Sequence, residues 1–456
     1  MIDQPQQKLN RAFSPWWFDP VPIDSLVAFR VFFGIMAGLD CIWFLQQGWI
    51  ATTFLEPPML FKYYGFGWVH PWPGMGMYVH FTALVILAAC VSVGLFYRVT
   101  AVALAMGLIY VFLLEKAIYL NHMYLICLIS GILAAIPCHR AFSLDVWRRP
   151  AMFSDTIPRW CLWLVRFQVA LPYVFGGIAK LNLDWLSGNT MFMFFVDDGK
   201  YPVLGSGMTS EPVVLFFTYG GLLFDLLVVP CLLWRKTRAV AFVCAFAFHL
   251  MNSQLFQIGI FPWLMIGATT IFLPPDWPRR FLQVPVIAPS RSSESLLTAQ
   301  KKRTLLLAAV YVAIQLVFPL RQFLYPGDPN WTDEGQAFSW RMMLRAKLAR
   351  VEVMAVDSRT GRRGPMPPEN FLNPRQVRNL SRSPDLMLQF SHYLAREHQR
   401  LGGGPLQVYW HVECSLNGRR PQLLIDPSVD LAAQPRSLWP AAWILPLQAS
   451  SVLADR

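Results

Sequence analysis

The residues of this sequence that are best suited to chemistry are a few polar side chains inside or beside long apolar stretches. They are His122, Lys180 and the run Asn252-Ser253-Gln254. An ionisable side chain is costly to place in an apolar membrane segment, so each such residue is a functional candidate by default. An amine and an imidazole can exchange protons, and amides can form hydrogen bonds with a ligand. Together these residue types indicate a polar pocket that contains a base.

Each candidate also has a structural interpretation. A lysine at a helix end commonly extends its amine to the membrane interface, whereas a partly buried lysine can serve as a base. His122 follows Asn121 and could cap the start of a helix. The run Asn252-Ser253-Gln254 could bond a tight interhelical turn, and His249 on an apolar helix face is more often a packing residue than a ligand. Buried interhelical pairs are expected for three more charged residues: Arg30, Asp40 and Asp225.

The composition indicates that lipid surrounds much of the chain. Of its 456 residues, 55% are hydrophobic and only 14% are charged, whereas a soluble domain carries about 25% charged residues. The net charge of +12 would suggest nucleic acid as a partner of a soluble protein. No nucleic-acid-binding motif accompanies it, and membrane proteins accumulate Lys and Arg on cytoplasmic loops for topological reasons. We therefore predict an integral membrane protein that binds no nucleic acid.

Windows of about 20 apolar residues predict where helices cross the bilayer. Six such windows lie near residues 24–46, 74–96, 99–117, 121–138, 159–182 and 211–234. The run 239–273 is too long for one crossing and contains the polar Asn252 cluster, so it predicts a two-helix hairpin. A last helix is expected over residues 304–320. The sequence therefore predicts an α-helical bundle of about nine transmembrane helices.

The basic residues predict how these helices are oriented. With a cytoplasmic N-terminus, the inside segments hold Lys8, Arg11, Arg98, Arg140, Arg148, Arg149, Arg235, Lys236, Arg238, Arg279, Arg280, Arg291, Lys301, Lys302 and Arg303, and the outside connections hold only three lysines. This bias follows the positive-inside rule and puts everything after the ninth helix on the extracytoplasmic face. His122, Lys180 and the Asn252 cluster then lie at outer helix ends. We expect them to line one cavity that opens outward.

The C-terminal part of the chain changes character. Residues 351–356 and 406–413 alternate apolar and polar side chains, which predicts half-buried strands, and a turn signal follows at 357–361. Residues 384–399 are expected to be helical. We predict a cytoplasmic N-terminal segment (1–23), a polytopic transmembrane catalytic domain (24–322) and an extracytoplasmic β-rich domain (323–456).

Neither metal-ligand spacing nor a phosphate-binding loop nor a nucleophile elbow is present in the sequence. An outward-facing polar pocket in a membrane protein suits a transporter as well as an enzyme. The large extracytoplasmic domain favours an enzyme or a receptor, but the residue types alone leave these alternatives open.

Several longer motifs narrow the choice. They are Phe248-His249-Leu250-Met251-Asn252-Ser253-Gln254-Leu255-Phe256, Pro275-Asp276-Trp277-Pro278-Arg279, Asn121-His122, Lys180-Leu181 with Asp184-Trp185, and Asn330-Trp331-Thr332 followed by Phe338-Ser339-Trp340 and Met342-Met343. In these motifs the sequence resembles the vitamin K-dependent gamma-glutamyl carboxylases. The resemblance runs from about residue 24 to 446, and it implies a compact, bacterial-type member with an HTTM-like membrane domain.

The resemblance implies a reaction. In that family a reduced vitamin K hydroquinone is deprotonated, reacts with O₂ and becomes a strong base on its way to the epoxide. That base removes a γ-proton from a glutamyl side chain, and the carbanion attacks CO₂. The expected enzyme belongs to the carbon–carbon lyase class and acts on a glutamate-containing peptide or protein. Its expected co-substrates are reduced vitamin K or menaquinol, O₂ and CO₂, with no metal, and a dry cavity would protect the short-lived base.

The same resemblance assigns roles to residues. Lys180 matches the lysine regarded as the base that deprotonates the hydroquinone, and His122 matches the histidine assigned to the carboxylation half of the reaction. Asn121 would orient a quinone oxygen. Cofactor contacts are further expected from His249, Asn252 and Gln254, and substrate contacts from Trp331 and Trp340.

One departure from the family concerns recruitment of the peptide. The vertebrate enzymes carry a basic glutamate-recognition segment that has no counterpart here. A quinol epoxidase or oxygenase without productive peptide carboxylation is therefore an alternative to the carboxylase. A third hypothesis is a non-enzymatic membrane protein that binds quinone or lipid.

Overall fold

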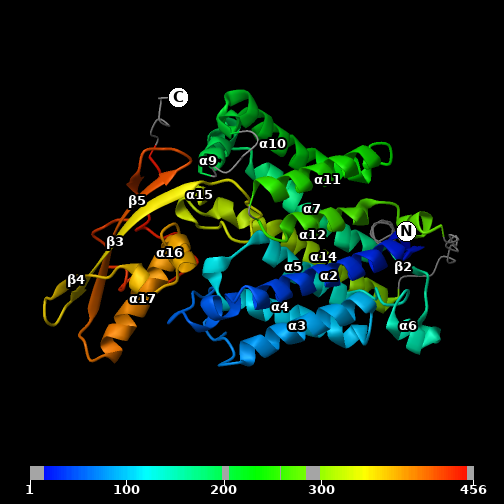
Figure 1. The fold of residues 1–456 in the computed structure, drawn as a ribbon, viewed down its shortest axis with the longest axis horizontal. Helices are drawn as coiled ribbons and strands as arrows, with labels where there is room; N and C mark the ends of the chain where they lie inside the picture. The colour runs from blue at the N-terminus through cyan, green and yellow to red at the C-terminus, as the bar shows by residue number, and fades with distance from the viewer. Residues whose placement is uncertain (1–14, 198–204, 257, 284–297, 449–456) are drawn as a thin grey trace, which may run out of the picture.

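The computed structural model describes residues 15–197, 205–256, 258–283 and 298–448. A helical bundle and a small C-terminal sheet lie side by side along the long axis of the molecule (Figure 1). Most of the predicted N-terminal segment, residues 1–14, lies outside the described residues. The bundle and the sheet region correspond to the two large parts that the change in sequence character predicts.

Helices lie at all nine positions that the apolar windows predict. They are α2 (Asp24–Gln46), α3 (Gly76–Val93), α4 (Tyr97–Leu114), α5 (Asn121–Ala135), α7 (Arg159–Ala179), α10 (Glu211–Leu233), α11 (Arg238–Leu255), α12 (Phe261–Thr269) and α14 (Ala299–Leu320). Six of the helices in the described part, namely α2, α3, α4, α7, α10 and α14, are long and apolar enough to cross a membrane. α5 and α12 are apolar but shorter. Length and composition therefore support six crossings, and nine remains a prediction.

Short elements connect these helices. They are the 3-10 turns Pro15–Phe18, Lys116–Ile118, Pro150–Met152, Gly205–Thr209, Thr270–Phe272 and Arg321–Leu324, the π-helical turn Ala51–Leu55, the helices α6 (Leu144–Arg148), α8 (Leu183–Leu186), α9 (Asn189–Asp197), α13 (Trp277–Phe281) and α15 (Pro329–Thr332), and the paired strands β1 (Pro20–Pro22) and β2 (Thr156–Pro158). Among them, α8 matters for the site because it begins shortly after Lys180, at Leu183.

Two adjacent glycines let α7 and α10 approach closely. A Cβ atom on Gly177 would lie 2.7 Å from Leu226 Cδ2, and one on Gly176 would lie 3.3 Å from Asp225 Oδ2. A larger residue at Gly177 would push the helices apart, because a Cβ contact below 3 Å requires a shift of the neighbour, and one at Gly176 would press on the Asp225 carboxylate. The close contact brings Asp225, in the middle of α10, beside the C-terminal end of α7.

The charged residues expected to form interhelical pairs behave differently from one another. Asp225 does form such a pair, with Lys180 at the end of α7. Arg30 does not: its guanidinium donates to the backbone carbonyls of Cys138, at 2.9 Å, and Phe142, at 2.6 Å, in the connection after α5. Carbonyls beyond a helix end lack intrahelical partners, so they can satisfy a buried guanidinium without a carboxylate. Asp40 has no ion pair among the described residues and lines a cavity instead.

The C-terminal region contains a four-stranded antiparallel sheet in the order β4-β3-β5-β6. Strands β3 (Lys347–Asp357) and β5 (Leu406–Leu416) pair along their full length, with Val353 opposite Trp410. The edge strands β4 (Arg363–Pro365) and β6 (Gln422–Leu423) are short. The two predicted strands and the predicted helix, α17 (Pro384–Arg400), are confirmed.

One face of this sheet packs against α17. Val408, Trp410 and Val412 on β5 are buried at every second position, as expected for a strand with one covered face. The Trp410 indole donates to Ser391 Oγ of α17 at 2.8 Å, and its ring lies 6.0 Å from that of Phe390. With α16 (Pro374–Leu380) beside α17, the domain is a mixture of helix and sheet, and β-rich describes only part of it.

Polar contacts hold this domain against one end of the bundle. The Glu115 carboxylate accepts from Gln376 Nε2 at 2.8 Å. Lys116 pairs with Asp385 at 2.6 Å, and Arg436 contacts the same carboxylate at 2.7 Å. Glu115 and Lys116 immediately follow α4, so the domain is held over the helix ends at which the candidate residues lie.

Candidate functional site

Two neighbouring cavities lie where the bundle meets the C-terminal domain. One, of about 730 Å³, is lined by Asn121 and His122, and we call it the His122 cavity. The other, of about 400 Å³, is lined by Lys180 and Asp225, and we call it the Lys180 cavity. Five residues line both cavities: Phe256, Ile258, Phe261, Met342 and Met343. The single cavity expected from the topology is therefore two adjacent ones with a shared apolar wall.

Lys180 is buried at the end of α7. Its backbone N–H closes the last turn of the helix on the Gly176 carbonyl, and its side chain forms an ion pair with Asp225. Lys180 and Asp225 are only 6% and 5% exposed. The Lys180 ammonium also lies 5.1 Å from the ring centroid of Trp185 on α8. The amine therefore points into the protein and does not extend to a membrane interface.

Aromatic side chains form much of the remaining wall of the Lys180 cavity, namely Phe216, Phe217, Phe224, Phe248 and Phe256. Asn252 and His249 add two polar groups. The His249 ring is 2% exposed, and its Nε2 lies 2.7 Å from the Tyr173 hydroxyl. This cavity thus combines apolar aromatic walls with one amine, one carboxylate, one imidazole and one amide.

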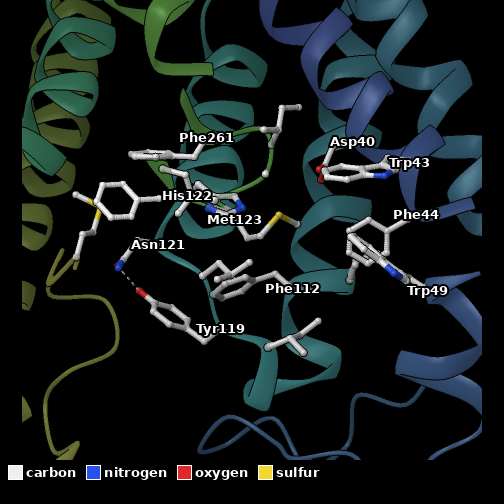
Figure 2. A pocket seen from close by; sticks show the side chains of 18 of the residues that line it. Asp40, Trp43, Phe44, Trp49, Phe112, Tyr119, Asn121, His122, Met123 and Phe261 are labelled. Atoms are coloured by element: carbon white, nitrogen blue, oxygen red, sulfur yellow. Dashed lines mark hydrogen bonds between the residues drawn. The ribbon is translucent and has the colours of Figure 1, made fainter. Parts of the chain in front are cut away.

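The His122 cavity is more polar, and Figure 2 shows its lining. The His122 ring stacks on Phe261, with ring centroids 5.8 Å apart, and makes no hydrogen bond with the residues that the structure describes. Its imidazole is therefore available to a ligand. Arg341, Arg375, Asp40 and Glu115 also line this cavity. The Arg341 guanidinium donates to Gln322 Oε1 at 2.6 Å, and the Glu115 carboxylate accepts from Gln376, so both of these groups already have partners in the protein.

Asn121 has a structural task besides any contact with a ligand. Its Oδ1 accepts from the Tyr119 hydroxyl at 2.9 Å (Figure 2), and its Nδ2 donates to the Arg341 carbonyl at 3.2 Å. One N–H of the amide is left for a ligand, because a primary amide has two. Gln254 also lines the His122 cavity, whereas Asn252, from the same motif, lines the Lys180 cavity.

The segment 338–343 forms the part of the shared wall that comes from the C-terminal region. Phe338, Trp340 and Met343 adopt left-handed backbone conformations, with φ of 64°, 55° and 55°, and each costs roughly 1–2 kcal/mol for a residue other than glycine. The Phe338 N–H donates to the Tyr119 hydroxyl at 2.8 Å. Surrounding contacts therefore hold the backbone in a conformation that it would not adopt alone. In the sequence, Met342 and Met343 belong to a motif of the family, but no local pattern indicates that they separate two cavities.

Trp331 and Trp340, expected to contact substrate, are 0% and 1% exposed. The Trp331 indole donates to the Leu445 carbonyl at 2.8 Å within the core of the C-terminal domain. Trp340 packs on Tyr124, with ring centroids 5.1 Å apart. Neither tryptophan is among the residues that line the two cavities. Both side chains are therefore core residues, and their packing stabilises the chain segments around the site.

An ion pair close to Lys180 joins the two parts of the molecule. Asp184 in α8 accepts from both terminal nitrogens of Arg419, one of them at 2.6 Å, and from Asn417 Nδ2 at 2.9 Å. Asn417 and Arg419 directly follow β5. In the sequence, Asp184 is recognisable only as part of the motif around Lys180, because its partners are more than 230 residues away along the chain.

Comparison with known families agrees with this architecture. Residues 18–277, the bulk of the bundle, match the HTTM domain, so the chain belongs to the HTTM family of membrane proteins. Residues 300–450 match the lumenal domain of the vitamin K-dependent gamma-carboxylases. The two domains together make this chain a member of the vitamin K-dependent gamma-glutamyl carboxylase family. No solved structure matches the chain.

Proposed function

We propose that this protein is a vitamin K-dependent gamma-glutamyl carboxylase, which oxidises a reduced quinone to the epoxide and carboxylates protein glutamyl residues. One observation carries the proposal: Lys180, the residue that matches the family base, is buried with Asp225 in an aromatic cavity beside the cavity of His122. Buried ionisable groups in a cavity are the usual setting for proton transfer in enzymes.

The Lys180 cavity suits a reduced vitamin K or menaquinol in chemical character. Its phenylalanines can cover a flat apolar ring, and Lys180, Asp225 and His249 can contact ring oxygens. When bound, the reduced quinone supplies, with O₂, the base that takes a γ-proton from a glutamyl side chain before CO₂ adds to it. We assign Asn252 to the same cavity as a further cofactor contact, and we propose that Asn121 and Gln254, which line the adjoining His122 cavity, contact the cofactor from that side.

The ion pair gives Lys180 a way to act as a base. Transfer of one proton from Lys180 Nζ to Asp225 Oδ2 converts the charged pair into a neutral amine and a neutral carboxyl. The neutral amine can take a proton from a quinol hydroxyl, and the negative oxygen of the deprotonated quinol then balances the ammonium that results, while Asp225 stays protonated. The cavity stays neutral overall at each stage, which limits the cost of handling charge in an apolar site.

The His122 cavity is the proposed place of the glutamyl side chain and CO₂. Arg375 lines it, with its guanidinium 5.9 Å from the ring centroid of Trp49 in the same lining, and a guanidinium group is well suited to hold a carboxylate. His122 would serve the carboxylation half of the reaction. Trp331 and Trp340 would affect the substrate only through the segments that they hold, because neither lines the cavity.

We further propose the topology that this chemistry requires. Nine helices would cross the membrane from a cytoplasmic N-terminal segment (1–23) through a catalytic membrane domain (24–322), so that the domain 323–456 and both cavities face the extracytoplasmic side. A lipid-soluble quinol would then enter from the bilayer and the peptide from outside. Labelling of single cysteines placed in the loops of the full chain, from either side of sealed vesicles, tests this orientation.

The test of function uses the full chain in nanodiscs with vitamin K hydroquinone, O₂, labelled CO₂ and a glutamate-containing peptide. Epoxide together with labelled peptide supports the carboxylase. Epoxide without label, across a set of peptides, favours the quinol epoxidase or oxygenase. Absence of both products, with Lys180→Ala indistinguishable from the parent, contradicts an enzyme and leaves the non-enzymatic quinone- or lipid-binding protein. Lys236→Ala, at an exposed lysine between α10 and α11, is the matched control.

A further inference from the structure

A row of three hydrogen-bonded side chains ends at the wall of the Lys180 cavity. Thr269 Oγ1 on α12 lies 3.1 Å from the Tyr173 hydroxyl on α7, and this hydroxyl lies 2.7 Å from His249 Nε2 on α11. Thr269 Oγ1 also lies 2.7 Å from the Met265 carbonyl. All three side chains are at most 3% exposed, so water does not compete for their hydrogen bonds.

The number of available protons determines which atom donates and which accepts in each of these hydrogen bonds. Each hydroxyl has one proton, and a carbonyl only accepts. If Thr269 donates to Met265 O, Tyr173 donates to Thr269 and His249 Nε2–H donates to Tyr173, all three contacts are hydrogen bonds. If Tyr173 donates to His249 instead, at most two of the three contacts contain a proton. The first arrangement is favoured, because an unmade buried hydrogen bond costs about 1–3 kcal/mol.

The favoured arrangement, in which His249 Nε2–H donates to Tyr173, specifies the tautomer of His249. No carboxylate lies within ion-pair distance of the ring among the described residues, and an unpaired charge is costly to bury, so the ring is neutral. A neutral imidazole has one N–H, which the Tyr173 contact uses at Nε2. His249 Nδ1 is then an acceptor, and it is buried without a hydrogen-bond partner in the described part of the chain. A buried acceptor normally has a hydrogen-bond donor, so we expect a bound ligand to supply one to His249 Nδ1.

We infer that His249 Nδ1 accepts a hydrogen bond from a hydroxyl of the reduced quinone, so that Thr269 and Tyr173 make the Lys180 cavity selective for the reduced over the oxidised form. The inference rests on the proposed function for the presence of a quinone. A hydroquinone has hydroxyl protons to donate, whereas a quinone has only acceptor oxygens, which an unprotonated nitrogen repels. Thr269 does not line the cavity, so it acts as a positioning residue.

Binding measured without oxygen tests this inference separately from catalysis. The full chain in nanodiscs is titrated with phylloquinone and with its hydroquinone, and the two dissociation constants are compared. A hydroquinone preference of about tenfold is expected for the parent, the size of one net hydrogen bond. In Thr269→Val, Tyr173 has only His249 Nε2 to donate to, which moves the imidazole proton to Nδ1, and the preference should invert toward the quinone.

Three further variants make the test specific. Thr269→Ser keeps the hydroxyl and should keep the parent preference, whereas Tyr173→Phe frees both tautomers and should bring the ratio of dissociation constants close to one. Thr270→Val removes a neighbouring hydroxyl whose hydrogen bond within the described part of the chain goes to the Gly267 carbonyl, and it should bind like the parent. Equal affinities of the parent for both forms, or an unchanged preference in folded Thr269→Val and Tyr173→Phe, would overturn the inference while the carboxylase proposal stands. Binding of neither form would overturn the quinone site itself.

Discussion

Lys180 and Asp225 form a buried ion pair that joins the end of α7 to the middle of α10. The pair is possible because Gly176 and Gly177 leave room for α10. A buried pair is weak evidence for stability, because desolvation offsets the attraction of the charges, but loss of one partner leaves an uncompensated charge. The contribution of the Lys180–Asp225 pair to catalysis can therefore be separated by experiment from its contribution to stability.

The two residues should respond differently to single and double substitution. Asp225→Asn should lower the free energy of unfolding by about 3–5 kcal/mol, because it strands the Lys180 ammonium in an apolar cavity. The double variant Lys180→Met with Asp225→Leu should recover most of this stability and still form no epoxide. Unfolding in detergent micelles and epoxide formation are measured in parallel. Glu211→Gln, at an exposed acid of the same helix, should change neither; a double variant that forms epoxide would refute the base role of Lys180.

His122 should be needed for carboxylation and not for oxidation of the quinone, because it lies in the other cavity. In His122→Ala, labelled CO₂ incorporation should fall about 100-fold or more, as for loss of an acid–base residue, while epoxide formation stays within about threefold. The ratio of the two products is the measurement. His70→Ala, at an exposed histidine of the connection before α3, serves as control. An equal loss of both products in His122→Ala would argue against separate tasks for the two cavities.

Arg419 should hold the C-terminal domain onto the segment that follows Lys180. Arg419→Ala removes two of the three hydrogen bonds to the buried Asp184 carboxylate and should destabilise the protein by about 2 kcal/mol. Limited proteolysis should then cut more readily near the connection 321–346, and epoxide formation should decrease. The neighbouring Arg420 is exposed, so Arg420→Ala is a close control. Identical proteolysis of the two variants would contradict the role of Arg419 in holding the C-terminal domain.

Lys347 predicts how stability changes with pH. Burial lowers the pKa of its ammonium to about 8, well below the value of about 10.4 in an unfolded chain. Between these values the unfolded state binds more protons, so stability should rise with pH from about 8 toward 10, by at most about 1.4 kcal/mol per pH unit. As pH falls below 8 this contribution is lost. A neutral amine still has two protons for the carbonyls of Trp331 and Arg382.

Unfolding followed by near-ultraviolet circular dichroism between pH 7.5 and 9.5 measures this slope in the full chain. Lys347→Met should flatten it, because the group that titrates is gone. Lys236→Met, at an exposed lysine, should leave it unchanged. A slope that persists in Lys347→Met would assign the pH dependence to another group.

Local patterns in the sequence determined much about this protein. Apolar windows located the helices, because a helix in lipid satisfies its own backbone and needs only apolar side chains around it. Period-two alternation located β3 and β5, because a sheet with one covered face buries every second residue. Motifs around Lys180, His122 and Asn252 indicated the family, and the family matches agree with that reading.

Only the tertiary structure decided how these residues are combined. Asp225 is 45 residues from Lys180, and Arg419 is 235 residues from Asp184; no local pattern encodes such partners, because helix packing brings them together. The same packing inserts Met342 and Met343 between two cavities and buries Trp331 and Trp340 away from both. Residue types thus determined which chemistry is available, and contacts between distant segments decided where each group meets its partner.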